Sequence, residues 1–217
     1  MPELHAAARQ ALSELPESAA FFERAERDLV GAPAVAFRAL FASVPRRFGS
    51  SAQLGAAAPS ELKAARPHWS ATDYARLWLL LRALPNVAED AQAAWVLQLF
   101  EAGELGEQVS ILRTLSALPE PARFLETSVQ ACRHNSLDVF EAIVAENRYL
   151  AEYFPDLNFN QAVMKAIFNG VSVRRIEQLE RRITPELSRM AAGYISERRA
   201  AARAVPQDAA YISNYGA

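Results

Sequence analysis

Residues 70–85 read SATDYARLWLLLRALP, and this stretch decides the fold class. Ser70 is suited to cap a helix, and Asp73 three residues later can accept a hydrogen bond from the Ser70 amide, as in a capping box. The helix that follows, through Leu84, is apolar on nearly all sides and carries Trp78 in its middle. A helix that is apolar all round is normally buried. We therefore predict a central helix around which other helices pack.

The rest of the chain also favours helices. Ala is abundant, Gly is scarce with 8 residues in 217, and β-branched residues form no alternating run, so strands are not expected. Prolines cut the sequence into helical pieces of ordinary length, with no strict repeat period. The sequence therefore predicts an all-α protein. We expect an irregular α-solenoid of antiparallel helical hairpins, and a closed helical bundle is the alternative.

Turn-forming residues suggest how the chain is organised. The helix that starts at Pro33 is expected to end before Pro45, where a stretch rich in Pro, Gly and Ser begins. The tail after Pro206 is expected to be less ordered. The predicted parts are an N-terminal helical segment (1–42), a loop-rich connection (43–69), a main helical body (70–206) and a C-terminal tail (207–217).

Several local signals place individual helices in the main body. Asn135 is expected to cap one helix, Gly170 to end another, and Thr184, followed by Pro and Glu, to start a third. Leucine and valine at spacings of four and three predict one core-facing stripe, which consists of Leu105, Val109, Leu112 and Leu115.

Charge and cysteine usage exclude some classes of protein. The net charge of −2 argues against a nucleic-acid-binding protein, which usually has a strong basic excess. The single cysteine, Cys132, cannot form an internal disulfide and indicates a reducing compartment. The N-terminal region shows no apolar signal-peptide core, and Arg76 and Arg82 interrupt the most apolar segment. We expect a cytoplasmic protein without a transmembrane segment.

Signatures of known catalytic and metal sites are missing from the sequence. It contains no nucleophile elbow, phosphate loop, zinc-protease motif or paired-cysteine motif. Cys132 and His134 lie two residues apart at a helix end and are expected to point away from each other, which disfavours a nucleophile pair. We therefore assign no catalytic residues and no metal ligands, and we expect no cofactor.

Polar residues between 135 and 170 leave several interpretations open. Asp138 and Glu141 share a helix face, where they could act as acid and base or bind a cation, or else cap the helix and pair with an Arg. Gln161, Lys165 and Asn169 form a stripe that is either the solvated face of a helix or a site where Lys165 holds an anion. An enzyme would require Asp138, Glu141 and Lys165 to converge.

Two further surfaces have alternative readings. Arg174, Arg181 and Arg182 either form a solvated face or a patch for an anionic partner; base-stacking aromatic residues are absent there, which favours the solvated face. A groove between helices could also bind a peptide.

About a third of the chain carries a family resemblance. The segments are NSLDVFEAIVAEN (135–147), YF (153–154), FNQAVMKAIFNG (159–170), RI (175–176), PELSRM (185–190) and YISERRAAARAVP (194–206). With these segments the C-terminal half resembles the EboA family. The family's frequent Pro-Tyr-Pro after the equivalent of Asn147 is replaced here by Arg148, Tyr149 and Leu150.

The resemblance implies an α-helical protein with no assigned catalytic activity. EboA-type proteins are encoded beside a UbiA-like prenyltransferase and a TatD-like metal hydrolase, in clusters linked to making or exporting prenylated and other secondary metabolites. The resemblance implies that eleven polar or aromatic residues match the family's motif positions, and Glu197 and Arg203 are two of them. We expect the other nine to bind a ligand or partner: Asn135, Asp138, Glu141, Asn147, Tyr153, Asn160, Gln161, Lys165 and Arg198.

These observations together favour a non-catalytic accessory protein that binds a cluster enzyme or a metabolite precursor. A small-molecule enzyme and a peptide-binding module are the alternatives. The polar groups are expected to line a groove or to clamp packed helices, joined in either case by a connected hydrogen-bond network.

Overall fold

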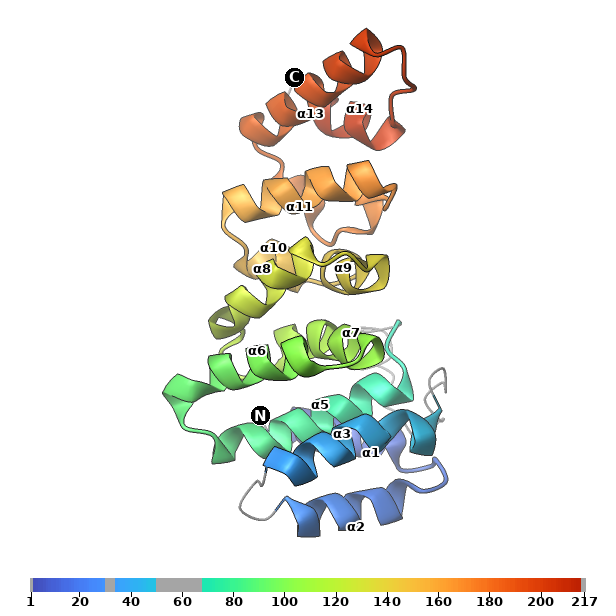
Figure 1. Cartoon of the computed structure of the whole chain (residues 1–217), viewed down its shortest axis with the longest axis vertical. Coiled ribbons are helices and arrows are strands. Elements are labelled where there is room, and N and C mark those ends of the chain that lie inside the picture. The colour runs from blue at the N-terminus through green and yellow to red at the C-terminus, as the bar shows by residue number, and fades with distance from the viewer. Residues whose placement is uncertain (1, 30–33, 50–67, 216–217) are drawn as a thin grey trace. The chain divides into compact units, whose positions relative to one another are not determined.

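The computed structural model describes residues 2–29, 34–49 and 68–215 (Figure 1). Every regular element in these ranges is an α-helix or a 3₁₀ helix, which confirms the all-α class. The chain divides into two compact units, Met1–Thr127 and Ser128–Ala217. The choice between a solenoid and a bundle stays a prediction, as do the four parts expected from the sequence.

The first unit contains the N-terminal helices and the predicted central helix. Its α-helices are α1 (Pro2–Leu12), α2 (Ser18–Asp28), α3 (Ala34–Phe48), α5 (Ala71–Ala83), α6 (Gln92–Ala102) and α7 (Leu105–Thr114). Its 3₁₀ turns are η1 (Leu84–Asn86), η2 (Glu89–Ala91), η3 (Leu115–Ala117) and η4 (Pro121–Phe124). Helix α8 (Leu125–Arg133) continues into the second unit.

The second unit contains shorter helices and one long pair. The α-helices are α9 (Leu137–Val144), α10 (Tyr149–Tyr153), α11 (Asp156–Asn169), α12 (Leu179–Arg182), α13 (Pro185–Ala200) and α14 (Gln207–Asn214). A 3₁₀ turn, η5 (Val173–Arg175), follows α11.

Helix α5 lies at the centre of the first unit, as its composition predicts. Helices α1, α3 and α7 pack against it, and nearly all of its side chains are buried. The predicted capping box is present, with the Ser70 amide donating to Asp73 Oδ2 at 2.9 Å and Ser70 Oγ accepting from the Asp73 amide. The sequence therefore places both the start and the burial of this helix correctly.

Polar side chains join α5 to α7 inside the core. Arg76 is 2% exposed and donates to Ser110 Oγ at 3.0 Å and to the Gly106 carbonyl. Ser110 Oγ in turn donates to Asp73 Oδ1 at 2.7 Å, and Arg113 pairs with Asp73 Oδ2 at 3.1 Å. Each buried charge thus has a partner, as burial in an apolar core requires.

The predicted apolar stripe of α7 is only partly correct. Leu112 and Leu115 are buried, but Leu105 is 45% exposed and Val109 is half-buried. The buried face of α7 includes Gln108, Ser110 and Thr114 instead. The bond from Ser110 to α5 explains the difference, because it turns a polar side of α7 toward the core.

Helix α3 does not end before Pro45, which corrects another expectation. It continues to Phe48 with Pro45 inside it. A proline has no amide hydrogen, so it cannot bond to the carbonyl four residues earlier. Arg76 Nε donates to that carbonyl, the oxygen of Phe41, at 3.4 Å. The expected loop at 43–69 is therefore helical up to Phe48, and its residues 50–67 lie outside the described ranges.

Helix boundaries in the second unit follow the sequence signals with one exception. Gly170 ends α11 in the left-handed conformation with φ 72°, and Thr184 Oγ1 caps α13 by accepting from the Leu187 amide. The prediction that Asn135 caps α9 is wrong. The cap residue is Ser136, whose amide donates to His134 Nδ1 at 3.0 Å, so the helix starts one residue later.

The C-terminal tail is more regular than expected, because α14 packs along α13. Ser188 Oγ on α13 donates to the Ile212 carbonyl at 3.0 Å, and the Val173 amide donates to Asp208 Oδ2 at 3.0 Å. Ala209 and Ile212 are buried. These contacts stabilise a helix that local sequence signals after Pro206 did not indicate. No described helix combines the length and apolar character that a bilayer span requires.

Candidate functional site: the pocket between α8 and α11

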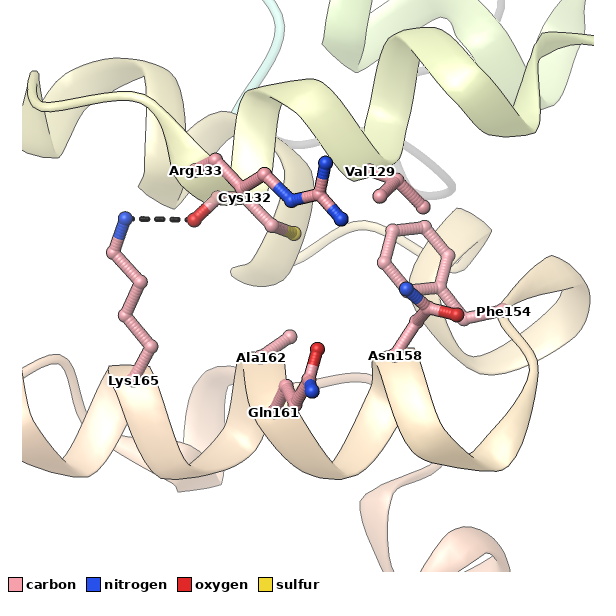
Figure 2. Close-up of a pocket in the computed structure, with 8 residues that line it drawn as sticks. All are labelled: Val129, Cys132, Arg133, Phe154, Asn158, Gln161, Ala162 and Lys165. Carbon is pink, nitrogen blue, oxygen red and sulfur yellow. Dashed lines mark hydrogen bonds between the residues drawn. The ribbon is translucent and has the colours of Figure 1, made fainter.

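A pocket of about 340 Å³ lies between α8 and α11 in the second unit (Figure 2). Figure 2 shows the Cys132 side chain extending from α8 toward α11, and the side chains of Gln161 and Ala162 extending from α11 toward α8. Phe154, which follows α10, lies beside Val129 and Asn158 at the right-hand side of the picture. The lining residues are Val129, Cys132, Arg133, Phe154, Asn158, Gln161, Ala162 and Lys165.

Helical spacing explains why these residues share one space. The α11 residues 158, 161, 162 and 165 recur at intervals of three and four, so they lie on one helix face. The α8 residues 129, 132 and 133 have the same spacing. Two helix faces of mixed polarity therefore oppose each other across the pocket.

Lys165 spans the gap between the two helices. Its Nζ donates to the Cys132 carbonyl at 2.6 Å and to the His134 carbonyl at 3.0 Å, and it lies 4.8 Å from the centre of the Phe140 ring. Carbonyls at a helix C-terminus lack partners within the helix, and a cation there also interacts favourably with the helix dipole. Lys165 thus holds the end of α8 in place.

A second pocket, of about 320 Å³, also includes Lys165 in its lining. The other residues that line it are His134, Asn135, Ser136, Leu137 and Asn169. Lys165 therefore borders both a space of mixed polarity and a space lined mainly by polar groups.

The Cys132 thiol is a poor nucleophile in this setting. Burial raises the pKa of the thiol to about 12, although the positive charges of Lys165 and Arg133 act in the opposite direction. The thiolate is the reactive form of cysteine, so Cys132 stays protonated and reacts slowly at neutral pH.

Arg133 is the second cation that lines the pocket, and its side-chain N–H donors are not used within the described residues. It is exposed and makes no hydrogen bond or ion pair within the part of the chain that the structure describes. Its guanidinium extends along the space between the helices in Figure 2. A guanidinium carries five N–H donors and binds carboxylate or phosphate with two parallel bonds.

The structure brings together three of the residues expected to bind a ligand or partner. Gln161 and Lys165 line the pocket between α8 and α11, and Asn135 lines the neighbouring one. Sequence reasoning missed Arg133 and Asn158. Arg133 lies four residues after Val129, and Asn158 lies three residues before Gln161. This helical spacing is the available signal, but it does not reveal which helices face each other.

Two other predicted residues hold turns together. Glu141 accepts from Arg175 at 2.6 Å, and Arg175 also pairs with Glu146 at 2.6 Å, so these carboxylates raise the pKa of Arg175. Asn147 donates to the Ala142 carbonyl at 2.8 Å and accepts from the Tyr149 amide at 3.0 Å. Both arrangements fix the connection after α9.

The remaining predicted residues lie apart from the pocket lining. Asp138 is exposed in the first turn of α9, Tyr153 packs on Tyr149, and Arg198 donates to the Ala204 carbonyl at 2.8 Å. Asn160 is 4% exposed, and its Oδ1 has no hydrogen-bond partner among the described residues. Glu141, Asn147 and Arg198 thus make local contacts with turns and helix ends, and the connected network expected from the sequence stays a prediction.

The geometry gives little support to an acid–base site. Glu141 binds Arg175 while Lys165 binds two main-chain carbonyls, so these groups have different partners. Among the described residues, no group of three or more His, Cys, Asp and Glu side chains is placed to hold a metal ion.

The arginines after α11 are largely engaged within the protein. Arg182 donates to the Phe154 carbonyl at 2.7 Å and to the Ala151 carbonyl, and it lies over the Phe159 ring. Arg174 lies 3.9 Å from the centre of the Tyr211 ring. These contacts do not favour a free patch for an anionic partner.

Comparisons with known proteins agree with the resemblance seen in the sequence. No curated protein and no solved structure matches the chain. One family model, described as "Metabolite traffic protein EboA", matches residues 6–211 and so covers nearly the whole chain, including both helices of the pocket. The chain therefore belongs to the EboA family.

Proposed function

We propose that this EboA-family protein is a non-catalytic accessory protein that binds a metabolite precursor in the pocket between α8 and α11. It would act in a cluster that makes or exports prenylated or other secondary metabolites. The pocket is the observation that carries this proposal. Its volume of about 340 Å³ is within the usual range for small-molecule sites, and its lining combines apolar side chains with amide and charged groups that could orient a ligand.

The state of the reactive groups supports binding over catalysis. Cys132 is protonated because burial raises its pKa, and Lys165 already binds the carbonyls at the end of α8. Glu141, a candidate acid or base, is paired with Arg175. Such groups can shape and hold a pocket, and none has the geometry of an activated nucleophile.

The partners that suit this role are enzymes that make or consume the metabolite. The prenyltransferase-like and TatD-like proteins implied by the family resemblance are the first candidates. A carrier of this kind would bind the precursor between two enzymatic steps and release it to the next enzyme.

Native mass spectrometry of the protein purified gently from its source organism tests the proposal. The expected result is a small molecule retained by the wild-type protein and lost from Gln161→Trp, which places an indole in the pocket. Gln161 is exposed at the pocket surface, so the substitution should be tolerated by the fold. Ala192→Trp, on the exposed side of α13, is the matched control.

A pull-down from the same cells with the two cluster enzymes as candidates extends the test to partners. A wild-type protein that retains no small molecule at native expression levels would overturn the proposed metabolite binding, and one that retains neither enzyme would overturn the proposed partners. Retention by wild type and Gln161→Trp alike would place the binding outside this pocket.

A further inference from the structure

The charge of the α8–α11 pocket is one-sided. Its lining contains two cations, Arg133 and Lys165, and neither Asp nor Glu. Lys165 uses two of its ammonium donors on the carbonyls of α8, whereas Arg133 has no hydrogen-bond or ion-pair partner in the described ranges. The pocket therefore presents positive charge together with unused N–H donors.

Apolar groups lie beside this charge. Val129, Ala162 and the Phe154 ring line the same space, and Ala162 and Phe154 are almost fully buried. These groups give the apolar part of an anionic ligand a surface to pack against, while Arg133 at the exposed edge can bind its charged part. Asn158 and Gln161 add amide groups that can donate to an anionic oxygen.

We propose that this pocket takes a small amphipathic anion, whose carboxylate or phosphate binds Arg133 while its apolar part lies against Val129, Phe154 and Ala162. The inference rests on the proposed function, since it names the ligand class of the same pocket. A volume of about 340 Å³ corresponds to about eleven water-sized groups. An anionic head with a chain of about eight carbons is therefore a suitable probe.

Isothermal titration calorimetry with four eight-carbon compounds tests the ligand class. Each compound is kept below its micelle concentration or its solubility limit. Octanoate and octyl phosphate should bind, octanol should bind about tenfold more weakly, and octylamine should not bind. Comparison of the two anions shows whether a carboxylate or a phosphate is the better head group. The reaction of Cys132 with N-ethylmaleimide locates the binding, because this lining thiol should react more slowly when the pocket is filled.

Substitution of the arginine separates charge recognition from apolar binding. Arg133→Gln should weaken the binding of both anions by about tenfold or more, because charge-assisted hydrogen bonds are lost. The affinity for octanol should stay unchanged. Arg199→Gln makes the same change of net charge at an exposed site on α13 and should leave all affinities unchanged.

Equal affinity for octanol and octanoate, unchanged by Arg133→Gln, would overturn the anionic class and leave the pocket's role as a binding site intact. Failure of all four compounds to bind would overturn the inference as well. The preparation from the source organism then decides separately whether the protein carries a metabolite at all.

Discussion

At the scale of single residues, polar side chains in this protein mainly satisfy main-chain groups that helices leave open. Arg76 donates to the Phe41 carbonyl that Pro45 cannot serve, and Lys165 donates to two carbonyls at the end of α8. Unpaired main-chain groups are costly when buried. This need explains why charged and amide residues occur between aromatic ones, and it leaves Arg133 as the exception in the pocket.

Cys132 should react slowly with thiol reagents. Its pKa of about 12, against 9.0 for an ordinary thiol, lowers the thiolate population about a thousandfold below pH 9. The higher basicity makes each thiolate a better nucleophile, so the net slowing is roughly thirtyfold. Alkylation by iodoacetamide at pH 8, followed by mass spectrometry, should show this slowing relative to the same protein unfolded in urea. Equal rates in the two states would contradict the burial of this thiol.

Alkaline pH should destabilise the protein. Burial raises the pKa of the Cys132 thiol from 9.0 to about 12 and raises that of the Tyr149 hydroxyl above its usual 10.0. Above pH 9 the unfolded chain therefore loses these protons before the folded protein does, and the free energy of unfolding falls as pH rises toward 12. Below pH 9 neither group contributes to this dependence.

Urea denaturation between pH 7 and 10.5 measures the effect. Cys132→Ala should reduce the loss of stability that begins near pH 9, and Tyr149→Phe should reduce the loss above pH 10. If both variants follow the wild-type pH dependence, these two groups do not cause it.

At the scale of elements, helix starts with a side-chain cap could be predicted from the sequence. The predicted caps Ser70 and Thr184 are correct, because each hydroxyl group accepts a hydrogen bond from an amide three residues away. The predictions are wrong where a residue distant in the sequence stabilises a helix. Arg76 donates to the Phe41 carbonyl, which Pro45 inside α3 leaves without its usual partner, and contacts with α13 stabilise α14. Local sequence carries no direct signal for such long-range partners.

The end of α8 should depend on Lys165. Lys165→Met keeps most of the aliphatic stem and removes the donors to the Cys132 and His134 carbonyls, so the free energy of unfolding should fall by about 1 to 3 kcal/mol. Urea denaturation measures the change. Gln161→Met, one turn earlier on the same helix, is the control and should change stability by less than about 0.5 kcal/mol, because Gln161 is exposed. Equal effects of the two substitutions would show that the carbonyl bonds contribute little.

At the scale of the whole molecule, the fold class was predictable and the location of the pocket was not. Composition and helix period indicate helices throughout, which the described ranges confirm. The pocket exists because α8 faces α11. The sequence of each helix on its own predicts only an amphipathic helix. The sequence alone therefore indicates Gln161 and Lys165 as candidates and does not indicate Arg133, which lies on the opposing helix.

The two compact units should respond separately to damage in their cores. Asp73, with its partners Ser70, Ser110 and Arg113, belongs to Met1–Thr127, whereas Lys165 and its partners belong to Ser128–Ala217. Asp73→Ala removes a helix cap and leaves buried donors unpaired, which should cost about 3 kcal/mol. Each compact unit of a protein can open with its own free energy.

Hydrogen exchange followed by mass spectrometry can compare the two units directly. Asp73→Ala should speed exchange in α1, α5 and α7 and leave α9 and α11 near their wild-type rates, because its lost contacts all lie in the first unit. Lys165→Met should have the opposite pattern, with faster exchange in α8, α9 and α11. If either substitution speeds exchange equally in both units, the chain unfolds as one cooperative body, and the division into two units has no energetic counterpart.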